Sequence, residues 1–333
     1  MTSPQQIEIL DIRHFTARQL RPLLEGEAAI WCKRLRWDYI TSTDLLLQYL
    51  DSRILPGFVA LNRGRICGYT FCVYEGPKAV VGDIYADPGN NDPLAVTFHL
   101  ARHLLDMLEA APDIDRIEAQ LLLFDSGILP AIFTGFKVFP RLFLEHDLQP
   151  SRSLPGAVAL PPPQPFEICP WSEQFYQPAA ELIQASYAGH IDSNINDQYR
   201  TLHGSLRFLH NVVRFPGCGT FDPMSSLILR ERAGNALIGI ILCSRIAGDV
   251  AHITQLCVAP ACRGRNFGAL LLGHCLAWLP AHRYRAITLT VSEANTPALR
   301  LYEAAGFTRR HRFDALALDK PPRRGFLNLI SYR

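Results

Sequence analysis

The sequence predicts a mixed α/β protein (α+β, with a mixed β-sheet) made of two similar halves, each a central sheet flanked by helices. Three observations lead to this prediction. A strand, a glycine-containing loop, a helix, a second strand and a short capped helix follow one another between His252 and Phe307. The segment 149–165 holds six prolines in 17 residues and divides the chain near its middle. The landmarks of the second half recur in the first half at nearly the same spacing.

The first half begins with a helical stretch and a β-hairpin, whose two strand-like runs flank Arg63-Gly64-Arg65. Its predicted elements are hairpin strands over 58–61 and 66–74, a strand over 80–85 that ends in Ala86-Asp87-Pro88, a helix over 94–110, a β-rich run over 116–124 and a helix that ends at Gly135-Phe136. The closing Gly-Phe lies 47 positions after Pro88.

The second half repeats this order. Its predicted elements are hairpin strands over 226–229 and 236–245, a strand over 250–258 that ends in Ala259-Pro260, a helix over 267–279, a β-rich run over 286–291 and a helix that ends at Gly306-Phe307. The closing Gly-Phe lies 46 positions after Pro260, which indicates duplication of a whole domain. Because the helix over 267–279 carries no charged residue, we expect the sheet to bury one side and the first domain or a partner subunit to cover the other.

The proline-rich segment sets the expected domain boundaries. So many prolines exclude a helix or a central strand, so we expect a first domain over 1–148, an extended linker over 149–165 and a second domain over 166–333. With 333 residues, the chain is long enough for two domains that each bury a core.

Composition and charge narrow the function classes. No apolar run approaches the roughly 20 residues that cross a bilayer, and the N-terminus lacks the regions of a signal peptide, so we expect a cytoplasmic protein with no membrane partner. Nine scattered cysteines, without Cys-x-x-Cys or Cys/His ligand spacing, predict neither a metal site nor a disulfide framework. A net charge of +2 predicts no nucleic-acid partner. The sequence leaves the oligomeric state open.

The loop Arg263-Gly264-Arg265-Asn266-Phe267-Gly268 follows a strand and opens a helix. Such a loop presents backbone N–H groups and the positive end of the helix dipole to an anion, most often a phosphate. The first half has Asn91-Asp92-Pro93-Leu94-Ala95-Val96 there, without the glycines or the basic residues. Phe124 stands opposite Asn295, and Ala131 opposite Tyr302. We therefore expect the first half to keep the scaffold without a cofactor site.

On these residues the second half resembles the GNAT superfamily of acyl-CoA-dependent N-acetyltransferases, and the whole chain resembles a tandem GNAT with a degenerate first copy. The superfamily's loop pattern, Arg/Gln-x-x-Gly-x-Gly/Ala, matches at Arg263 and Gly268, whereas Asn266 replaces the middle glycine. Its second signature matches at Asn295, Leu301-Tyr302 and Gly306-Phe307. The resemblance implies acetyl-CoA as co-substrate, no metal, and a small-molecule or peptide amine as acceptor.

The resemblance also implies where the cofactor binds. The pyrophosphate is expected on the main-chain N–H groups of Arg263, Gly264, Arg265, Asn266, Phe267 and Gly268. Asn adopts left-handed conformations more often than most residues, so we expect altered affinity rather than loss of binding. Asn295 is expected to bond the pantetheine arm or the strand end, and the backbone N–H near Cys257 or Val258 to polarise the thioester carbonyl. The alternatives are an ordinary helix start with solvated arginines, and a turn-forming asparagine.

Tyr302 is the expected general acid, because a phenol is neutral at pH 7 and can donate a proton to the departing thiolate. Thr296 as N-cap, Pro297 at the first helical position and Gly306 at the end are expected to fix its helix. The alternative is a core tyrosine that only packs.

His252 is the first candidate for the general base, because imidazole titrates near neutrality. A hydrogen-bonded structural histidine is the alternative, and Glu293, Asp249, Tyr187 or a water chain are further candidates for the base. Cys257 raises the possibility of an acyl-cysteine intermediate, but no His/Asp partner is identifiable, so direct attack in a ternary complex is favoured.

The acceptor site is expected partly in the polar stretch 187–199, which connects two helices of the second half, although loops are polar by default. The predicted function is transfer of an acetyl group from acetyl-CoA to a primary amine, with catalysis in the second domain. The alternatives are another short acyl donor and a non-catalytic CoA-binding sensor or interaction module.

Overall fold

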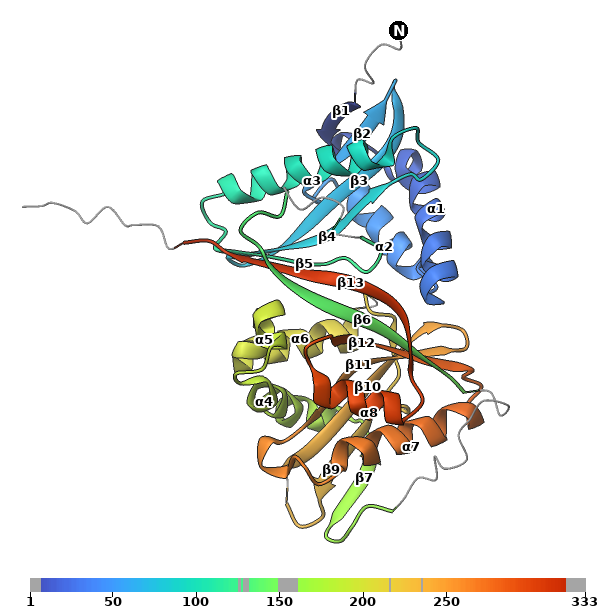
Figure 1. The fold of residues 1–333 in the computed structure, drawn as a ribbon, viewed down its shortest axis with the longest axis vertical. Coiled ribbons are helices and arrows are strands. Elements are labelled where there is room, and N and C mark those ends of the chain that lie inside the picture. Colours follow the sequence, from blue (N-terminus) through green and yellow to red (C-terminus); the bar gives the residue numbers. More distant parts are fainter. Residues whose placement is uncertain are drawn as a thin grey trace, which may run out of the picture.

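The computed structural model describes residues 7–124, 127, 132–148, 161–215, 217–234 and 236–321. One continuous mixed sheet runs through both halves, in the order β1-β2-β3-β4-β5-β13-β6-β12-β11-β10-β9-β7, with β8 paired to β10 (Figure 1). The order has the same pattern from either end: a run of first-half strands mirrors a run of second-half strands. The structure thus confirms the mixed α/β fold.

The first-half elements follow the predicted order. They are β1 (Ile7–Asp11), α1 (Ala17–Leu35), α2 (Ile40–Asp51), β2 (Gly57–Asn62), β3 (Arg65–Glu75), β4 (Lys78–Ala86), α3 (Pro93–Ala110), β5 (Arg116–Gln120) and β6 (Lys137–Asp147). Two predictions were wrong in detail. The strand predicted over 116–124 ends at Gln120, because Phe124 N–H closes a turn onto Leu121 O. Residues 132–135 form turns rather than the end of a helix, and Ala131 lies outside the described residues.

The second half repeats the series. Its elements are β7 (Phe166–Pro170), α4 (Tyr176–Tyr187), α5 (Asp192–Ile195), the 3₁₀ helix η4 (Asp197–Arg200), α6 (Leu202–Arg214), β8 (Thr220–Phe221), β9 (Leu227–Glu231), β10 (Leu237–Ala247), β11 (Val250–Val258), the 3₁₀ helix η5 (Pro260–Cys262), α7 (Phe267–Ala281), β12 (Ala286–Ser292), α8 (Thr296–Ala304) and β13 (Thr308–Asp319). Most of the expected linker, 149–160, lies outside the described residues, and β7 begins directly after its last proline.

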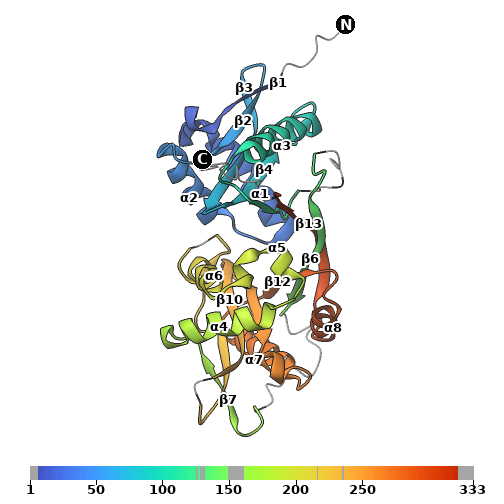
Figure 2. The same cartoon turned by 90° about the vertical axis from the view of Figure 1, so that its left-hand side faces the viewer.

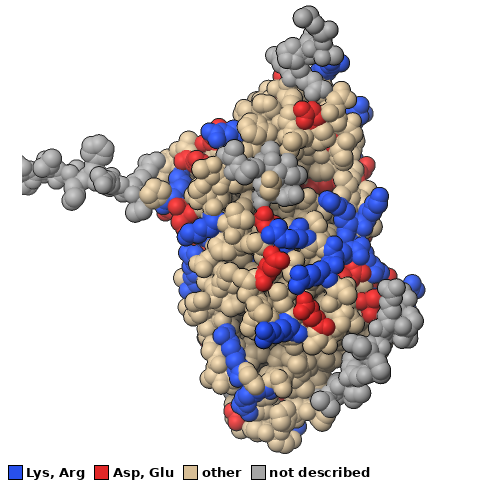
Figure 3. All heavy atoms as spheres, viewed as in Figure 1, with Lys and Arg blue, Asp and Glu red and all other residues tan. Residues whose placement is uncertain are grey.

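The last strand of each half is exchanged with the other half. β6 pairs antiparallel with β12, and β13 pairs antiparallel with β5, so β6 and β13 lie side by side at the centre of the sheet (Figure 1). At the surface of this junction basic side chains gather with acidic ones beside them (Figure 3). Among them, Arg36 and Arg310 both contact the carboxylate of Glu145. The sheet runs through both halves without a break. The expected domain boundaries at 148 and 166 therefore stay a prediction.

Helices pack on both faces of the sheet in each half. In the second half α4 covers Ile240 and Leu242 of β10, whereas α7 covers the alternate residues Ile241 and Cys243. Gly239 lets α7 approach closely, since a Cβ there would lie 2.9 Å from Leu271 Cδ1.

The outer face of α7 is formed by small or partly exposed residues, among them Gly273 and Trp278, and Trp278 stacks on His282. In Figures 1 and 2, α7 lies away from the first half, so the first domain does not cover this face, and cover by a partner subunit, the other alternative, stays a prediction. The described part of the chain contains no helix that is both long and apolar enough to cross a membrane.

Candidate active site

The site begins where two parallel strands separate. β11 pairs with β12 only from Val250–Ile253 to Ala286–Leu289. Beyond Ile253, the edge of β11 that faces β12 has no ladder partner among the described strands. A β-bulge between Leu242 and Cys243 interrupts the pairing of β10 with β11 at the same level. This separation opens the sheet between β11 and β12.

A cavity of about 470 Å³ lies at this opening. Its walls come from α4, the 192–199 segment, α6, β11, β12 and α8, and from two first-half residues, Gln120 and Arg141. Tyr302, His252 and Asn295, three residues that the sequence singles out, line it together, and so does Tyr187. The structure thus brings residues from the beginning and the end of the second half together around this cavity.

The loop before α7 has an open conformation. Gly264 and Asn266 have positive φ values of 76° and 58°, so the expectation that Asn266 adopts the left-handed region is confirmed. No side chain caps α7, and residues 263–266 are exposed, which leaves the N–H groups of its first turn accessible. The loop lies at the far end of β11 and does not line the cavity.

The two arginines of this loop are held by the protein. Arg263 donates to Ser186 O at 2.6 Å, which ties the loop to α4. The guanidinium of Arg265 lies over the rings of Phe166 and Phe267, 5.1 and 4.8 Å from their centroids. These contacts hold both side chains beside the loop, while the main-chain N–H groups of the first turn of α7 remain open to an anion.

Asn295, not Thr296, is the N-cap of α8. Its side chain accepts from Ala298 N at 3.3 Å, and Pro297 follows as the second helical residue. The expectation for Thr296 was wrong because the Asn oxygen reaches the N–H three residues on. The Nδ2 of Asn295 also lies 3.3 Å from Nε2 of His190. Gly306 ends the region with a φ of 87°, as expected.

Tyr302 projects from α8 and is 7% exposed. Its ring lies 5.7 Å from that of Phe307 and it packs in the core below, while the residue also borders the cavity. Burial raises its pKa, and Asp192 and Cys257 raise it further. The phenol therefore stays protonated at neutral pH, as a proton donor requires. Its catalytic role remains a prediction.

His252 is buried between first-half aromatic rings. Its ring lies 5.0 Å from Trp37 and 5.9 Å from Phe143, and Nδ1 lies 2.8 Å from Thr288 Oγ1. Because the Thr288 hydroxyl donates to Ala251 O, Nδ1 is the nitrogen that carries the proton. Burial, and then the charge of Arg141, lower the pKa of His252 to about 3. The imidazole is therefore neutral at physiological pH.

Cys257 is buried against α4 and does not line the cavity. Burial raises the pKa of its thiol to about 12, so it is protonated and a weak nucleophile at neutral pH. Of the other candidate bases, Glu293 pairs with Arg312, and Asp249 accepts from Arg285 N through its backbone. Neither borders the cavity.

The polar stretch 187–199 forms one wall. Tyr187 donates to Gln255 Oε1 at 3.0 Å, and its ring stacks on Tyr199 at 4.3 Å. Asp192, which sequence reasoning treated only as part of this stretch, is buried and accepts from the hydroxyl of Ser292. The stretch thus places one carboxylate and two phenols at the cavity.

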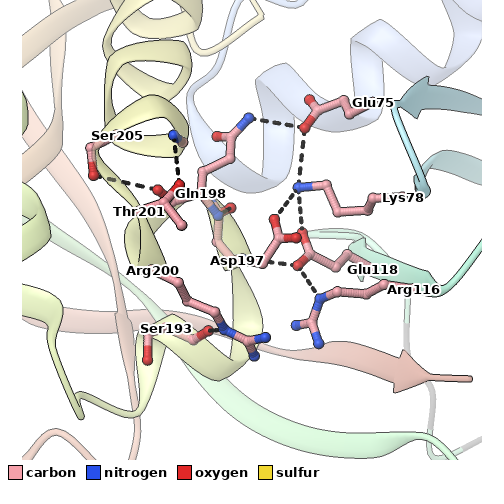
Figure 4. Close-up of polar contacts among 12 residues, drawn as sticks. Glu75, Lys78, Arg116, Glu118, Ser193, Asp197, Gln198, Arg200, Thr201 and Ser205 are labelled. Atoms are coloured by element: carbon pink, nitrogen blue, oxygen red, sulfur yellow. Dashed lines mark hydrogen bonds and ion pairs between the residues drawn. The ribbon is translucent and has the colours of Figure 1, made fainter. Parts of the chain in front are cut away.

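First-half side chains hold this wall in place. Lys78 is 4% exposed and its Nζ contacts Asp197, Glu75 and Glu118 at 2.6, 3.1 and 3.2 Å (Figure 4). Burial opposes the charge of Lys78, but the carboxylates outweigh it and raise its pKa. Glu118 also accepts from the backbone N–H of Asp197 at 3.0 Å. Figure 2 shows α5 at the junction between the halves.

Arg141 and the network around Lys78 were missed at the sequence level. Arg141 lies in the apolar run Val138–Leu144 of β6, and strand exchange carries that run beside β12. A charged residue inside an apolar strand is the one signal that could have found it.

Comparison with known proteins identifies relatives. Residues 171–307 match the acetyltransferase (GNAT) family. A mycothiol acetyltransferase of Thermomonospora curvata is 36% identical over 102 residues, 31% of this chain and 33% of that protein. Another, of Thermobispora bispora, is 38% identical over 95 residues, 27% of this chain and 32% of that protein. This chain therefore aligns with about a third of the length of these curated relatives.

Solved structures match over nearly the whole chain. A GCN5-related N-acetyltransferase from Sphaerobacter thermophilus aligns with a TM-score of 0.64 at 16% identity, over 96% of this chain and 98% of that chain. A tandem GNAT protein from the clavulanic acid biosynthesis pathway aligns with a TM-score of 0.59 at 16% identity, over 95% and 99%. At this identity the likeness shows the fold.

Proposed function

Through its second half the chain belongs to the GNAT superfamily of acetyltransferases, and on that premise we propose that it transfers an acetyl group from acetyl-CoA to a primary amine. The observation that carries the proposal is the arrangement around the separated strands. Tyr302 and Asn295 border a cavity at the opening of β11 and β12, and an uncapped, exposed helix start lies at the end of β11.

The residues present fit the CoA group. The accessible N–H groups at residues 264–268 would hold the pyrophosphate, because the positive φ of Gly264 and Asn266 exposes backbone there. Gly268 has only Leu301 and Val258 near its would-be Cβ, at 3.5 and 3.9 Å, so α7 and α8 frame the same opening. When bound, acetyl-CoA supplies an activated thioester. The unpaired edge of β11 would offer the N–H of Val258 to its carbonyl, because the N–H of Cys257 faces β10, as that of Ala259 does.

Tyr302 is proposed as the general acid toward the departing thiolate. Its raised pKa keeps the phenol protonated at neutral pH, so its O–H is available to donate to the sulfur as negative charge develops there.

His252 is a weak candidate for the base, since an imidazole with a pKa near 3 holds a proton too weakly to take one from an ammonium efficiently. We propose instead that the ammonium binds beside Asp192 and loses its proton to water in the cavity, one of the routes that the sequence left open.

The test is a pair of measurements on the same protein. Calorimetric titration with acetyl-CoA is expected to show binding, and thiol release from acetyl-CoA is expected with members of a primary-amine panel. Binding without turnover on any amine would favour a CoA-binding sensor, and absence of binding would contradict the proposal. His252→Asn is expected to leave the pH dependence of turnover in place, and loss of one ionisation would restore His252 as the base.

A further inference from the structure

Two arginines are buried among the described residues, and they differ in how well their donors are satisfied. Arg116, 5% exposed, donates from Nε to Glu118, from one terminal nitrogen to Asp319 and from the other to Asn194 O. Arg141, 9% exposed, donates from one terminal nitrogen to Thr290 Oγ1 at a long 3.3 Å. Its Nε has no hydrogen-bond partner in the described part of the chain.

The charge of Arg141 is also only weakly compensated. Its nearest carboxylate oxygen belongs to Asp192, 4.0 Å away, and that oxygen already accepts from Ser292. The charge of Arg141 also contributes to lowering the pKa of His252, which lines the same cavity. A buried guanidinium with unused donors costs free energy unless an acceptor satisfies it.

A second unused donor lines the same cavity. Gln255 is 4% exposed, and its Oε1 accepts from Tyr187, whereas its Nε2 has no partner in the described residues. Arg141 and Gln255 therefore both line one cavity and both carry an N–H group without an acceptor in the described residues, and the carboxylate of Asp192 lines the same cavity. Bidentate or charge-assisted bonds from a guanidinium favour a carboxylate over other acceptors.

We propose that the acceptor is a small amine that also carries a carboxylate, bound with its ammonium group toward Asp192 and its carboxylate toward Arg141. The short separation of 4.0 Å between the two protein charges fits an acceptor whose own charges are separated by only a few carbon atoms, as in an amino acid. This inference rests on the proposed acetyl transfer. It makes the first half, through β6, a contributor to acceptor selection.

The experiment compares matched acceptors that differ only in the carboxylate, for example L-leucine with L-leucinamide and L-phenylalanine with L-phenylalaninamide. In the wild type, kcat/KM for the acid is expected to exceed that for the amide by about 10- to 100-fold, the range of a charge-assisted buried contact. Arg141→Gln is expected to reduce the ratio to near one, and Arg141→Lys to keep part of it. Equal turnover of acid and amide by the wild type, or an unchanged ratio in Arg141→Gln, would overturn the inference.

Controls separate this inference from the proposed function and from folding. Arg312→Gln, on an exposed neighbour of β6, is expected to leave the ratio unchanged. Acetyl-CoA affinity and thermal unfolding of each variant show whether the fold and the cofactor site remain. If no amine is turned over, the same acids and amides are titrated calorimetrically with CoA present and absent. Carboxylate-dependent binding lost in Arg141→Gln then supports the inference, and its absence in the wild type contradicts it.

Discussion

The two halves share one scaffold but differ in the residues that begin their parallel strand pairs, β4 and β5 in the first half and β11 and β12 in the second. In register, Lys78 pairs with Arg116 in the first half as Val250 pairs with Ala286 in the second. The first half thus carries charges where the second carries apolar core, and those charges bind the 192–200 segment of the other half. One copy has become the support for the wall of the other copy's cavity.

The helices α3 and α7, which follow the corresponding loops, differ in how their N-termini are capped. Asp92 caps α3 by accepting from Ala95 N, and Pro93 occupies its first position. The anion site at that helix start is therefore already filled by the chain's own carboxylate. α7 has no side-chain cap, so its first N–H groups remain available to a ligand. This contrast supports the expectation that the first half lacks a cofactor phosphate site, which stays a prediction.

The open parts of the strands differ as well. In the second half, Gln255 of β11 accepts from Tyr187. The corresponding position of β4 in the first half is Asp83, which faces Glu27. Both acids line a first-half cavity of about 540 Å³. Glu27 accepts from Tyr69 and Trp31. Burial, and then the charge of Asp83, raise the pKa of Glu27 well above its ordinary value. The comparison leads to four predictions.

The largest effect is expected from removal of the charge that joins the halves. Lys78→Met leaves Glu75 and Asp197 without their buried cation and Glu118 with Arg116 alone, which should lower the free energy of unfolding by about 3–5 kcal/mol. Urea denaturation measures this loss. Lys137→Met, at an exposed lysine on β6, is the matched control and should change stability by less than about 0.5 kcal/mol. A loss below 1 kcal/mol for Lys78→Met would show that the network does not anchor the 192–199 wall of the cavity.

The second prediction concerns the phenol that only the second half retains. Tyr302→Phe removes the proton donor while keeping the packing against Phe307, so kcat should fall by about 100-fold or more with acetyl-CoA affinity nearly unchanged. Thiol release and calorimetric titration measure the two quantities. Tyr49→Phe, on the exposed side of α2, serves as the control. Unchanged kcat in Tyr302→Phe would remove Tyr302 from the mechanism.

The third prediction uses the first-half acid pair. Because the pKa of Glu27 is raised on folding, the native state binds more protons than the unfolded state above the ordinary value of about 4.3. The stability contributed by this group is present below that value and is lost as pH rises toward the native pKa, by up to about 1.4 kcal/mol per pH unit.

Glu27→Gln should remove this loss and flatten the pH dependence of unfolding in that interval. Glu25→Gln, at an exposed position of α1, should leave the dependence unchanged. Equal pH profiles for wild type and Glu27→Gln would show that the acid pair is not coupled to folding.

The smallest effects are expected at the helix start. Asn266→Gly should strengthen acetyl-CoA binding about two- to fivefold, because glycine adopts the observed φ of 58° without strain. Asn266→Asp should weaken binding by a similar factor, since it places a carboxylate where Asp92 stands in the first half. Calorimetric titration compares the variants with Asp92→Asn as control. The opposite order of affinities would contradict a phosphate site at this loop.

Much of the second half could be predicted from its sequence because its signals are local. The glycine and asparagine of the loop and the Gly-Phe after α8 each fix nearby backbone, whereas the N-cap of α8 was predicted one residue too late, at Thr296 instead of Asn295. The duplication could be predicted for the same reason, since spacing between local landmarks is preserved.

The strand exchange and Arg141 could not be predicted in this way. β6 and β13 each contain a continuous buried run, 141–144 in β6 and 315–317 in β13, and such a run does not say which sheet edge the strand joins. Lys78 and Glu118 look like solvent-facing residues of strands until a segment far along the chain covers them. A contact between segments that are far apart in the sequence does not change the hydrophobic periodicity of either segment, so it cannot be predicted from that pattern.

The exchanged strands also determine when the first half can complete its sheet during translation. β5 ends at Gln120, and its partner β13 begins only at Thr308. While the ribosome makes the intervening residues, the nascent first half exposes an unpaired sheet edge that other chains could join. We therefore expect release of β13 from the exit tunnel, rather than completion of the first half, to mark the moment at which the nascent protein becomes resistant to aggregation.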